Sequence, residues 1–181
     1  MERKPIRLSG TSYAVLALLS HLGESTPYDL KQALVRSIEN FWQVPHTTFY
    51  AEPARLAAAG YLSERQEQHG RRRKLYALTD QGRAALDEWV ASPVAAPQEV
   101  RDEAILKVFA GADPAPLLHR RREWHATKLA ELEGYAQHDE WRLTDHTGPT
   151  RTLATGIAYH RFSLSAIDAY LAALEAGDQP W

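Results

Sequence analysis

The chain has 181 residues, no cysteine, 44% hydrophobic residues and a formal net charge of −2. This composition is typical of a folded protein with one large or two small domains, and it excludes a disulfide scaffold, a thiolate nucleophile and a zinc site with cysteine ligands. The amino terminus has no apolar signal segment and no apolar run approaches the ~20 residues of a membrane span, so we expect a cytoplasmic protein without membrane association.

Three short helices are predicted in the first sixty residues. Apolar residues recur at helical spacing over residues 10–22. Thr26 can cap the next helix, and Pro27 suits its first position because the missing N–H costs nothing there. A third helix is predicted over residues 47–59 and ends at Gly60. The spacing therefore indicates a compact group of three helices.

A β-hairpin and a fourth helix follow. The segment 61–68 has the pattern of a weak strand, His69 and Gly70 form a turn signal, and residues 73–78 alternate in polarity. A helix is then expected from Thr79, and the proline-containing segment 93–98 is a linker. Four consecutive cations occupy the hairpin tip, namely Arg71, Arg72, Arg73 and Lys74.

This order of elements predicts a winged helix-turn-helix domain over residues 1–92, with a two-stranded wing. In such a domain a helix enters the major groove of DNA while the wing lies against phosphates. A basic run of this kind is by itself often only a solvated loop. Beside a predicted recognition helix, we interpret it as a contact with double-stranded DNA.

The rest of the chain, residues 99–181, is predicted to be a helical dimerisation domain, which makes the protein mainly α. Helices are expected over residues 99–111, 113–142 and from about 150, with a loop at 142–149. The last helix carries an apolar seam typical of a coiled coil. Its predicted dimerisation residues are Leu153, Ile157, Leu164, Ile167, Leu171 and Leu174. A monomer with a well-packed helical domain is the alternative.

Several motifs taken together resemble the PadR-type family of transcriptional regulators. They are residues 41–50 (FWQVPHTTFY), 55–62 (RLAAAGYL), 70–79 (GRRRKLYALT), 82–83 (GR) and 101–109 (RDEAILKVF). The resemblance implies a homodimeric, repressor-like regulator that binds a pseudo-palindromic operator. It also implies that the third helix reads the major groove and that the wing touches the backbone.

Carried over by position, the resemblance and the basic run nominate the DNA-binding residues. They are Tyr28, Lys31, His46, Thr47, Thr48, Tyr50, Arg55, His69, Arg71, Arg72, Arg73 and Lys74. Two of them have alternatives. Arg55 either reads a guanine or pairs with Glu52 on a solvated face, and Tyr28 either touches phosphate or packs against the third helix.

Pro53 falls within the predicted third helix, where a proline removes a backbone hydrogen bond. Either the helix begins late enough to place Pro53 in its first turn, or the helix is kinked. The position of Thr47 and Thr48 depends on which of these holds.

Two histidines interrupt apolar seams of the C-terminal helices, His125 on one and His160 on the other. Each either forms a local hydrogen bond, or both face one polar spot where they meet each other or an effector. With the neighbouring Trp124 and Tyr159, they form a candidate pocket for a small aromatic or lipophilic effector.

No sequence motif nominates an enzyme, a cofactor or a metal site. The eight histidines include no pair at helical ligand spacing, and phosphate-binding glycine loops and nucleophile motifs are absent. We therefore expect neither catalysis nor a cofactor. Two alternative functions remain, a MarR-like regulator and a winged-helix adaptor that binds an acidic protein.

Overall fold

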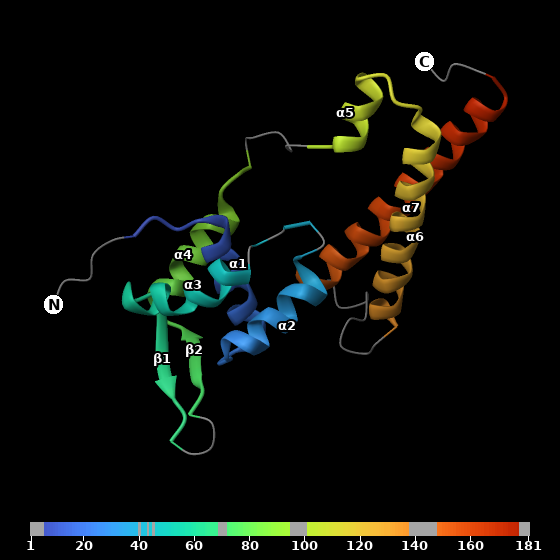
Figure 1. Cartoon of the computed structure of the whole chain (residues 1–181). Coiled ribbons are helices and arrows are strands. Elements are labelled where there is room, and N and C mark those ends of the chain that lie inside the picture. Colours follow the sequence, from blue (N-terminus) through green and yellow to red (C-terminus); the bar gives the residue numbers. More distant parts are fainter. Residues whose placement is uncertain are drawn as a thin grey trace. The chain divides into compact units, whose positions relative to one another are not determined.

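The computed structural model describes residues 6–39, 41, 42, 44, 46–68, 72–94, 101–137 and 148–177. The chain divides into two compact units, residues 1–96 and 97–181. The first contains α1 (Gly10–Leu22), α2 (Pro27–Ser37), α3 (His46–Ala58), β1 (Leu62–Gln66), β2 (Lys74–Leu78) and α4 (Asp80–Ala91). The second contains α5 (Glu103–Phe109), α6 (Pro114–Ala136) and α7 (Gly148–Glu175) (Figure 1). The predicted fold class, a mainly helical protein with a winged helix-turn-helix, is confirmed.

Side-chain caps fix where the helices of the first unit begin. The Thr26 hydroxyl accepts from the backbone N–H of Asp29, and the Asp29 carboxylate accepts from the N–H of Thr26. This reciprocal pair satisfies two donors that the helix itself leaves free, and Pro27 lies at the first helical position as predicted. Thr79 caps α4 through the N–H of Gly82. Local sequence therefore determines the starts of α2 and α4.

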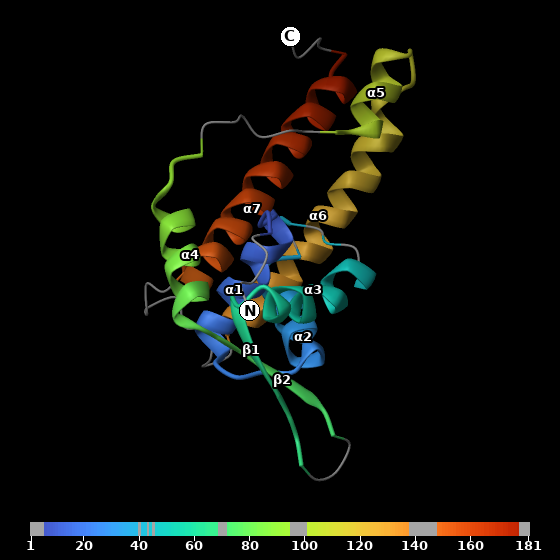
Figure 2. The same ribbon diagram turned by 90° about the vertical axis from the view of Figure 1, so that its left-hand side faces the viewer.

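The wing is an antiparallel hairpin in which Leu62 pairs with Leu78 and Gln66 pairs with Lys74. Figure 2 shows it projecting away from the helices of its unit. Lys74 is the first residue of β2, and Arg72 and Arg73 precede it. Arg72 has φ 50°, a left-handed conformation typical of a turn. The described part of the basic run therefore leads into the second strand, and Lys74 belongs to that strand.

A single apolar core holds the first unit together. It includes buried residues from every helix and both strands of that unit: Val15, Leu16, Leu30, Leu34, Phe49, Leu56, Leu62, Tyr76, Leu78 and Leu86. Pro53 is also fully buried, in the interior of α3. Of the two alternatives for Pro53, the structure excludes the late start, since α3 begins at His46, close to the predicted start, and Pro53 lies well beyond its first turn.

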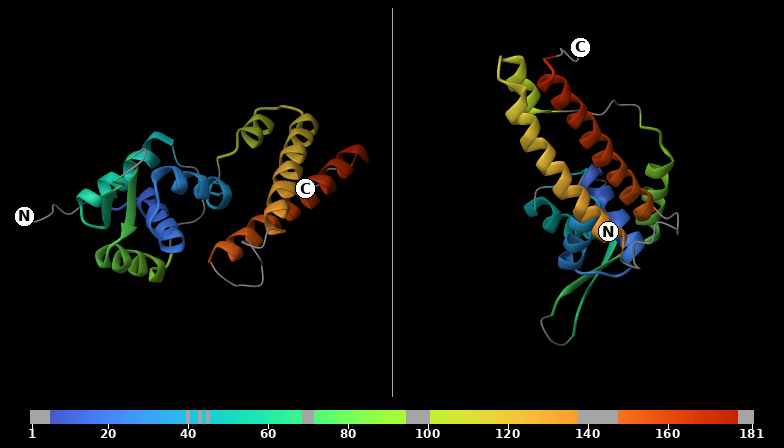
Figure 3. Two further views of the ribbon diagram at one scale, coloured as in Figure 1. Left: turned by 90° about the horizontal axis from the view of Figure 1, so that it is seen from below. Right: turned by 90° about the vertical axis from the view of Figure 1, so that its right-hand side faces the viewer.

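The second unit is built on α6 and α7, which run side by side (Figures 1 and 3). Leu132 of α6 packs with Leu153 and Ile157 of α7. Two predicted boundaries are wrong. The short helix begins at Glu103 instead of residue 99 because Asp102 caps it, and α7 already includes Gly148 and Pro149, which were predicted to lie in a loop. Most of the predicted linker, 95–98, lies outside the described residues, as do residues 138–142 of the predicted second helix.

The apolar seam of α7 is used within one chain. Leu153, Ile157, Ile167 and Leu171 are buried in the single protomer, and Leu164 and Leu174 are half-buried. A 4-3 spacing requires a neighbouring helix, and α6 of the same chain supplies it. Four of the six predicted dimerisation residues are therefore already covered within the chain, and dimerisation through this seam stays a prediction.

None of the described helices has the combination of length and hydrophobicity that a membrane span requires.

Candidate nucleic-acid interface and ligand cavity

The start of α3 presents polar side chains to solvent. Thr47, Thr48 and Tyr50 are exposed, whereas Phe49 between them is fully buried in the core. Phe49 points into the core, and its burial determines which face of α3 is turned towards solvent. The structure thus places these three predicted contact residues together on an accessible face. The side chain of His46 lies outside the described set.

Arg55 and Glu52 form a polar cluster with Ser12 of α1. Arg55 donates from Nε to Glu52 Oε2 (2.8 Å) and from Nη2 to Glu52 Oε1 (2.6 Å), while the Ser12 hydroxyl donates to the same Oε1 (2.6 Å). Burial by itself raises the pKa of Glu52, but the hydrogen bonds from Arg55 and Ser12 outweigh it and hold that pKa below its usual value. Of the two alternatives for Arg55, the structure forms the pair with Glu52, but Glu52 is buried and does not lie on a solvated face. The hydrogen bonds with Ser12 link this pair to α1.

Replacement of Arg55 by Ala is expected to lower the free energy of unfolding by about 1–3 kcal/mol, since the buried Glu52 loses two charged donors. We expect a loss of stability near the lower end of this range, because the Arg55 side chain is 40% exposed and its charge is partly screened by water. Urea unfolding of the variant measures this loss.

A double-mutant cycle with Glu52→Gln supplies the control for the Arg55 prediction. The paired variant is expected to lose less stability than the two single variants added together, because each single change removes the same contacts. If Arg55→Ala instead leaves stability unchanged and relaxes base preference, Arg55 reads DNA.

The two candidates on α2, Tyr28 and Lys31, differ in their exposure to solvent. Lys31 is buried and its Nζ donates to Glu39 Oε1 at 3.0 Å, so its ammonium group is not displayed for a phosphate contact as predicted. Tyr28 is largely exposed, so it does not take the alternative of burial against α3. On α2, Tyr28 is therefore the better placed of the two to touch a phosphate.

Carboxylates accompany most of the described cations of the wing. Arg73 donates from Nη2 to Glu67 Oε1 (2.9 Å), and the Lys74 ammonium lies 2.8 Å from Glu64 Oε1. The Arg72 side chain is exposed and has no carboxylate partner among the described residues. His69 and Arg71 lie outside the described residues. In the described part of the basic run, Arg72 is thus the cation most available to an external anion.

Carboxylate pairing on the wing also involves Tyr76. Its hydroxyl donates to Glu64 Oε2 at 2.9 Å. Burial and this hydrogen bond raise the pKa of Tyr76 to about 12. Glu64 of β1 therefore accepts from both Tyr76 and Lys74 of β2, which links the two strands of the wing.

His125 of α6 and His160 of α7 meet inside the second unit. Their Nδ1 atoms lie 2.8 Å apart, and both residues are buried. Of the two alternatives for these histidines, the structure forms the one in which they share a polar spot. One imidazole donates and the other accepts, which requires that at least one ring is neutral. Trp124 and Tyr159 pack around the pair, with ring centroids 4.7 Å (Trp124–His125) and 5.2 Å (Tyr159–His160) apart.

The histidine pair predicts acid sensitivity of the second unit. Burial lowers the pKa of both groups from 6.5. The neighbouring His160 and Arg121 lower the pKa of His125 further, and Lys128 lowers that of His160. Below the reference value the unfolded chain binds more protons than the folded chain, so stability is present above about pH 6.5 and is lost as the pH falls below it. Thermal unfolding from about pH 7.5 to about pH 5.5 measures this loss.

Changing both His125 and His160 to Leu should remove most of that pH dependence. His119→Leu provides the matched control, because His119 is exposed on the same helix. An unchanged pH dependence in the double variant would show that other groups govern acid stability.

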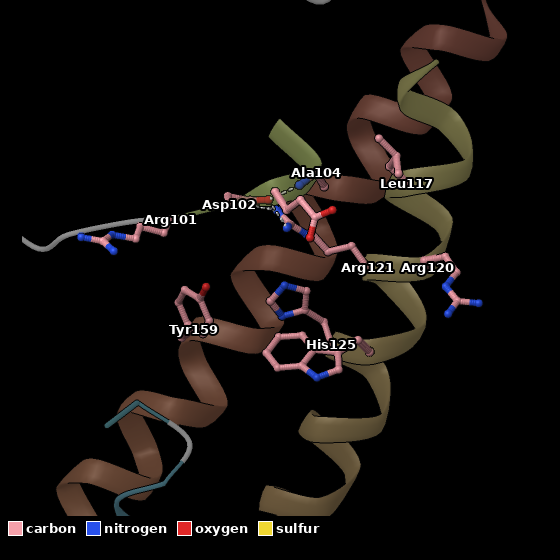
Figure 4. A pocket seen from close by; sticks show the side chains of 10 residues that line it. Arg101, Asp102, Ala104, Leu117, Arg120, Arg121, His125 and Tyr159 are labelled. Carbon is pink, nitrogen blue, oxygen red and sulfur yellow. Dashed lines mark hydrogen bonds and ion pairs between the residues drawn. The ribbon is translucent and has the colours of Figure 1, made fainter. Parts of the chain in front are cut away.

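A cavity of about 570 Å³ lies in the second unit beside these aromatic residues (Figure 4). Its lining residues come from the segment before α5 and from α5, α6 and α7: Arg101, Asp102, Glu103, Ala104, Leu117, Arg120, Arg121, Trp124, His125 and Tyr159. Three of the four predicted effector-pocket residues line it: Trp124, His125 and Tyr159. The fourth, His160, contacts all three. Asp102 and Arg121, which also line the cavity, were not among the predicted residues; only their charge and their position beside an apolar seam could have suggested them.

Within the described residues, no group of three or more His, Cys, Asp or Glu side chains is arranged to hold a metal ion.

Two protein-family models match most of the chain between them. The Transcriptional regulator PadR-like family matches residues 15–88, and a family described as Virulence activator alpha C-term matches residues 100–175. The chain is 29% identical to the negative transcriptional regulator PadR of Bacillus subtilis over 129 residues, which cover 67% of this chain and 70% of that protein.

Solved structures share the fold across both units. Bacillus subtilis PadR in complex with operator DNA aligns with a TM-score of 0.75 at 24% identity, over 93% of this chain and 99% of that one. The same Bacillus protein in complex with p-coumaric acid aligns with a TM-score of 0.70 at 24% identity, over 91% and 98%.

Proposed function

This chain belongs to the PadR-like family of transcriptional regulators, and we propose that it acts in the cytoplasm as a homodimeric repressor of a pseudo-palindromic operator, relieved by a small aromatic or lipophilic effector. Proteins of this family are DNA-binding regulators and not enzymes. The family match favours neither the MarR-like regulator nor the adaptor. The proposal of repression is supported by the name of the Bacillus relative, a negative regulator.

The observation that carries DNA binding is the exposed start of α3. Thr47, Thr48 and Tyr50 offer hydroxyl groups at the surface of the unit that also carries the basic wing. Hydroxyl side chains serve both phosphates and base edges, whereas wing cations add an attraction that does not depend on base sequence. The Bacillus relative with the same fold has been crystallised with operator DNA.

The exposed apolar surface of the second unit supports a dimer. With most of the α7 seam buried in the protomer, the large exposed apolar residues of this unit include Ile105, Leu106 and Phe109 of α5 and Phe162 of α7. A second copy of the chain would remove such side chains from water. Two winged helices can then read two half-sites about one DNA turn apart. We therefore assign the dimer contact to these faces instead of the seam.

The cavity beside Trp124 and Tyr159 supports an effector role. Its volume of about 570 Å³ suits a small molecule. The fold relative that binds p-coumaric acid provides a precedent for an aromatic ligand.

A gel-shift titration with the DNA upstream of the protein's own gene tests the regulator function. We expect retarded bands that persist in the presence of competitor DNA. We also expect the expression of a reporter gene behind this DNA to fall when the protein is present. Sedimentation of the free protein at micromolar concentration tests the dimer. Binding that competitor DNA removes completely would contradict a specific operator, and a rise in reporter expression would contradict repression.

A further inference from the structure

Pro53 interrupts the backbone hydrogen bonds inside α3, which packs against α1 in the first unit (Figure 1). Proline has no N–H group, so the carbonyl of Phe49, four residues earlier, receives no backbone donor from position 53. The exposed start of α3, with Thr47 and Thr48, lies before the proline, and the rest of the helix follows it. The helix is therefore weakened between its exposed start and its second half.

Two side chains bridge this weak point. Glu52 immediately precedes Pro53 and Arg55 follows it, and they form a bidentate pair with N–O distances of 2.8 and 2.6 Å. A bidentate contact between a guanidinium and a carboxylate fixes the orientation of both groups, which a single point contact does not. The pair therefore holds the residues before and after the proline in one geometry.

Ser12 of α1 fixes the position of this pair. Its hydroxyl donates to Glu52 Oε1 (2.6 Å) and accepts from Arg55 Nη2 (3.0 Å). It also accepts from the backbone N–H of Ser9 (2.8 Å), which is the N-cap of α1. These contacts match the one donor and two acceptor sites of a hydroxyl group. The capped start of α1 thereby sets the position of α3 at Glu52.

Burial keeps two members of the Ser12–Glu52–Arg55 cluster away from DNA. Ser12 is fully buried and Glu52 is 5% exposed, so neither side chain can contact a duplex. Thr48 is exposed and lies one helical turn before Glu52 on the same face of α3. A change at Glu52 can therefore act on bound DNA through the position of exposed residues such as Thr48.

We propose that Ser12 and Glu52 are positioning residues for DNA recognition: with Arg55 they hold the exposed start of α3, across Pro53, in the orientation that reads base sequence. This inference rests on the proposed role of α3 as the recognition helix. The cluster contributes to discrimination between DNA sequences, whereas the wing supplies affinity for any duplex.

Glu52→Gln tests the cluster, because it removes the charge that holds the guanidinium and keeps the size of the side chain. Fluorescence anisotropy of the full-length protein, with the DNA upstream of its own gene and with an unrelated duplex of equal length, measures sequence preference. We expect the preference for the upstream DNA to fall at least about fivefold, the effect of one misplaced base contact. Affinity for the unrelated duplex should change by less than about threefold, since the wing is intact. Ser12→Ala should lower the preference in the same direction.

Pro53→Ala supplies the rescue. Alanine restores the backbone N–H, so the continuity of α3 depends less on the cluster. The double variant Glu52→Gln/Pro53→Ala has the same charge as Glu52→Gln, and it should recover most of the lost preference. Leu86→Ala, in α4 and the same core, is the control for stability. It should lower the free energy of unfolding and leave the preference unchanged.

Amide hydrogen exchange of the free full-length protein tests the cluster without DNA. In Glu52→Gln, exchange at residues 50–52, just before Pro53, should accelerate at least about fivefold more than exchange in α4, because the loss is local. In Leu86→Ala, residues 50–52 should not accelerate more than α4. Circular dichroism shows whether each variant is folded.

The outcomes separate this inference from the proposed function. An unchanged preference in Glu52→Gln would overturn the positioning role, and so would a loss that Pro53→Ala does not recover. Stronger binding of the upstream DNA by Glu52→Gln would also overturn it, because the released Arg55 would then contact DNA itself. If the unmodified protein does not prefer the upstream DNA, the operator proposal fails for that DNA. The exchange pattern then decides on the cluster: local acceleration before Pro53 supports it, and uniform acceleration overturns it.

Discussion

Replacement of Arg71, Arg72 and Arg73 together by Ala is expected to weaken binding to every duplex by about 10- to 100-fold at moderate salt, because each cation that neutralises a phosphate releases a counterion on binding. The slope of log K against log salt should become shallower by about one for each lost contact. Gel shifts or fluorescence anisotropy at several salt concentrations, with operator and unrelated DNA, measure both quantities. Equal slopes for the variant and the unmodified protein would contradict a phosphate-binding wing.

Single variants show how much each cation of the wing contributes to DNA affinity. Arg72→Ala should weaken binding more than Arg73→Ala, since Arg73 is already paired with Glu67 and Arg72 has no such partner among the described residues. Glu67→Gln frees the Arg73 guanidinium and should strengthen binding to unrelated DNA. A loss of affinity in Glu67→Gln would mean that the ion pair shapes the wing instead of competing with DNA.

Substitution of Ile167 by Asp should lower the free energy of unfolding by at least about 4 kcal/mol, because it removes apolar packing and buries a carboxylate without a partner. Phe162→Asp lies on the same helix and should change the intrinsic stability of one chain by about 0.5 kcal/mol or less. The contrast arises because Ile167 is 7% exposed in the single chain and Phe162 is 74% exposed. Urea unfolding followed by circular dichroism measures the difference.

The same two variants test the dimer interface. Phe162→Asp is expected to shift the equilibrium from dimer to folded monomer, since it puts a charge into the proposed contact face. Sedimentation over a range of concentrations gives the mass. If Ile167→Asp is a folded monomer and Phe162→Asp remains fully dimeric, the apolar seam of α7 forms the dimer contact and the face that carries Phe162 does not.

Much of the fold follows from signals that are local in the chain. Thr26 with Pro27, and Thr79 before α4, mark helix starts whatever surrounds them, because caps satisfy backbone donors within three residues. The alternation of residues 73–78 likewise predicted β2. The boundary at α5 was missed because both Asp102 and the segment before it are compatible with helix, and the cap was not recognised.

The sequence by itself determined the order of elements, the winged helix and the family, because spacing, caps and turn residues act over a few positions. Tertiary structure decided which partners the side chains meet. A seam residue such as Leu153 is equally satisfied by α6 of the same chain or by a second copy, and Arg55 has the same spacing from Glu52 whether it reads DNA or closes an ion pair. Asp102 and Arg121 are 19 positions apart, so only the packing of α5 on α6 could bring them together at a cavity. Periodicity specifies which face of a helix is apolar, but it does not specify what covers that face.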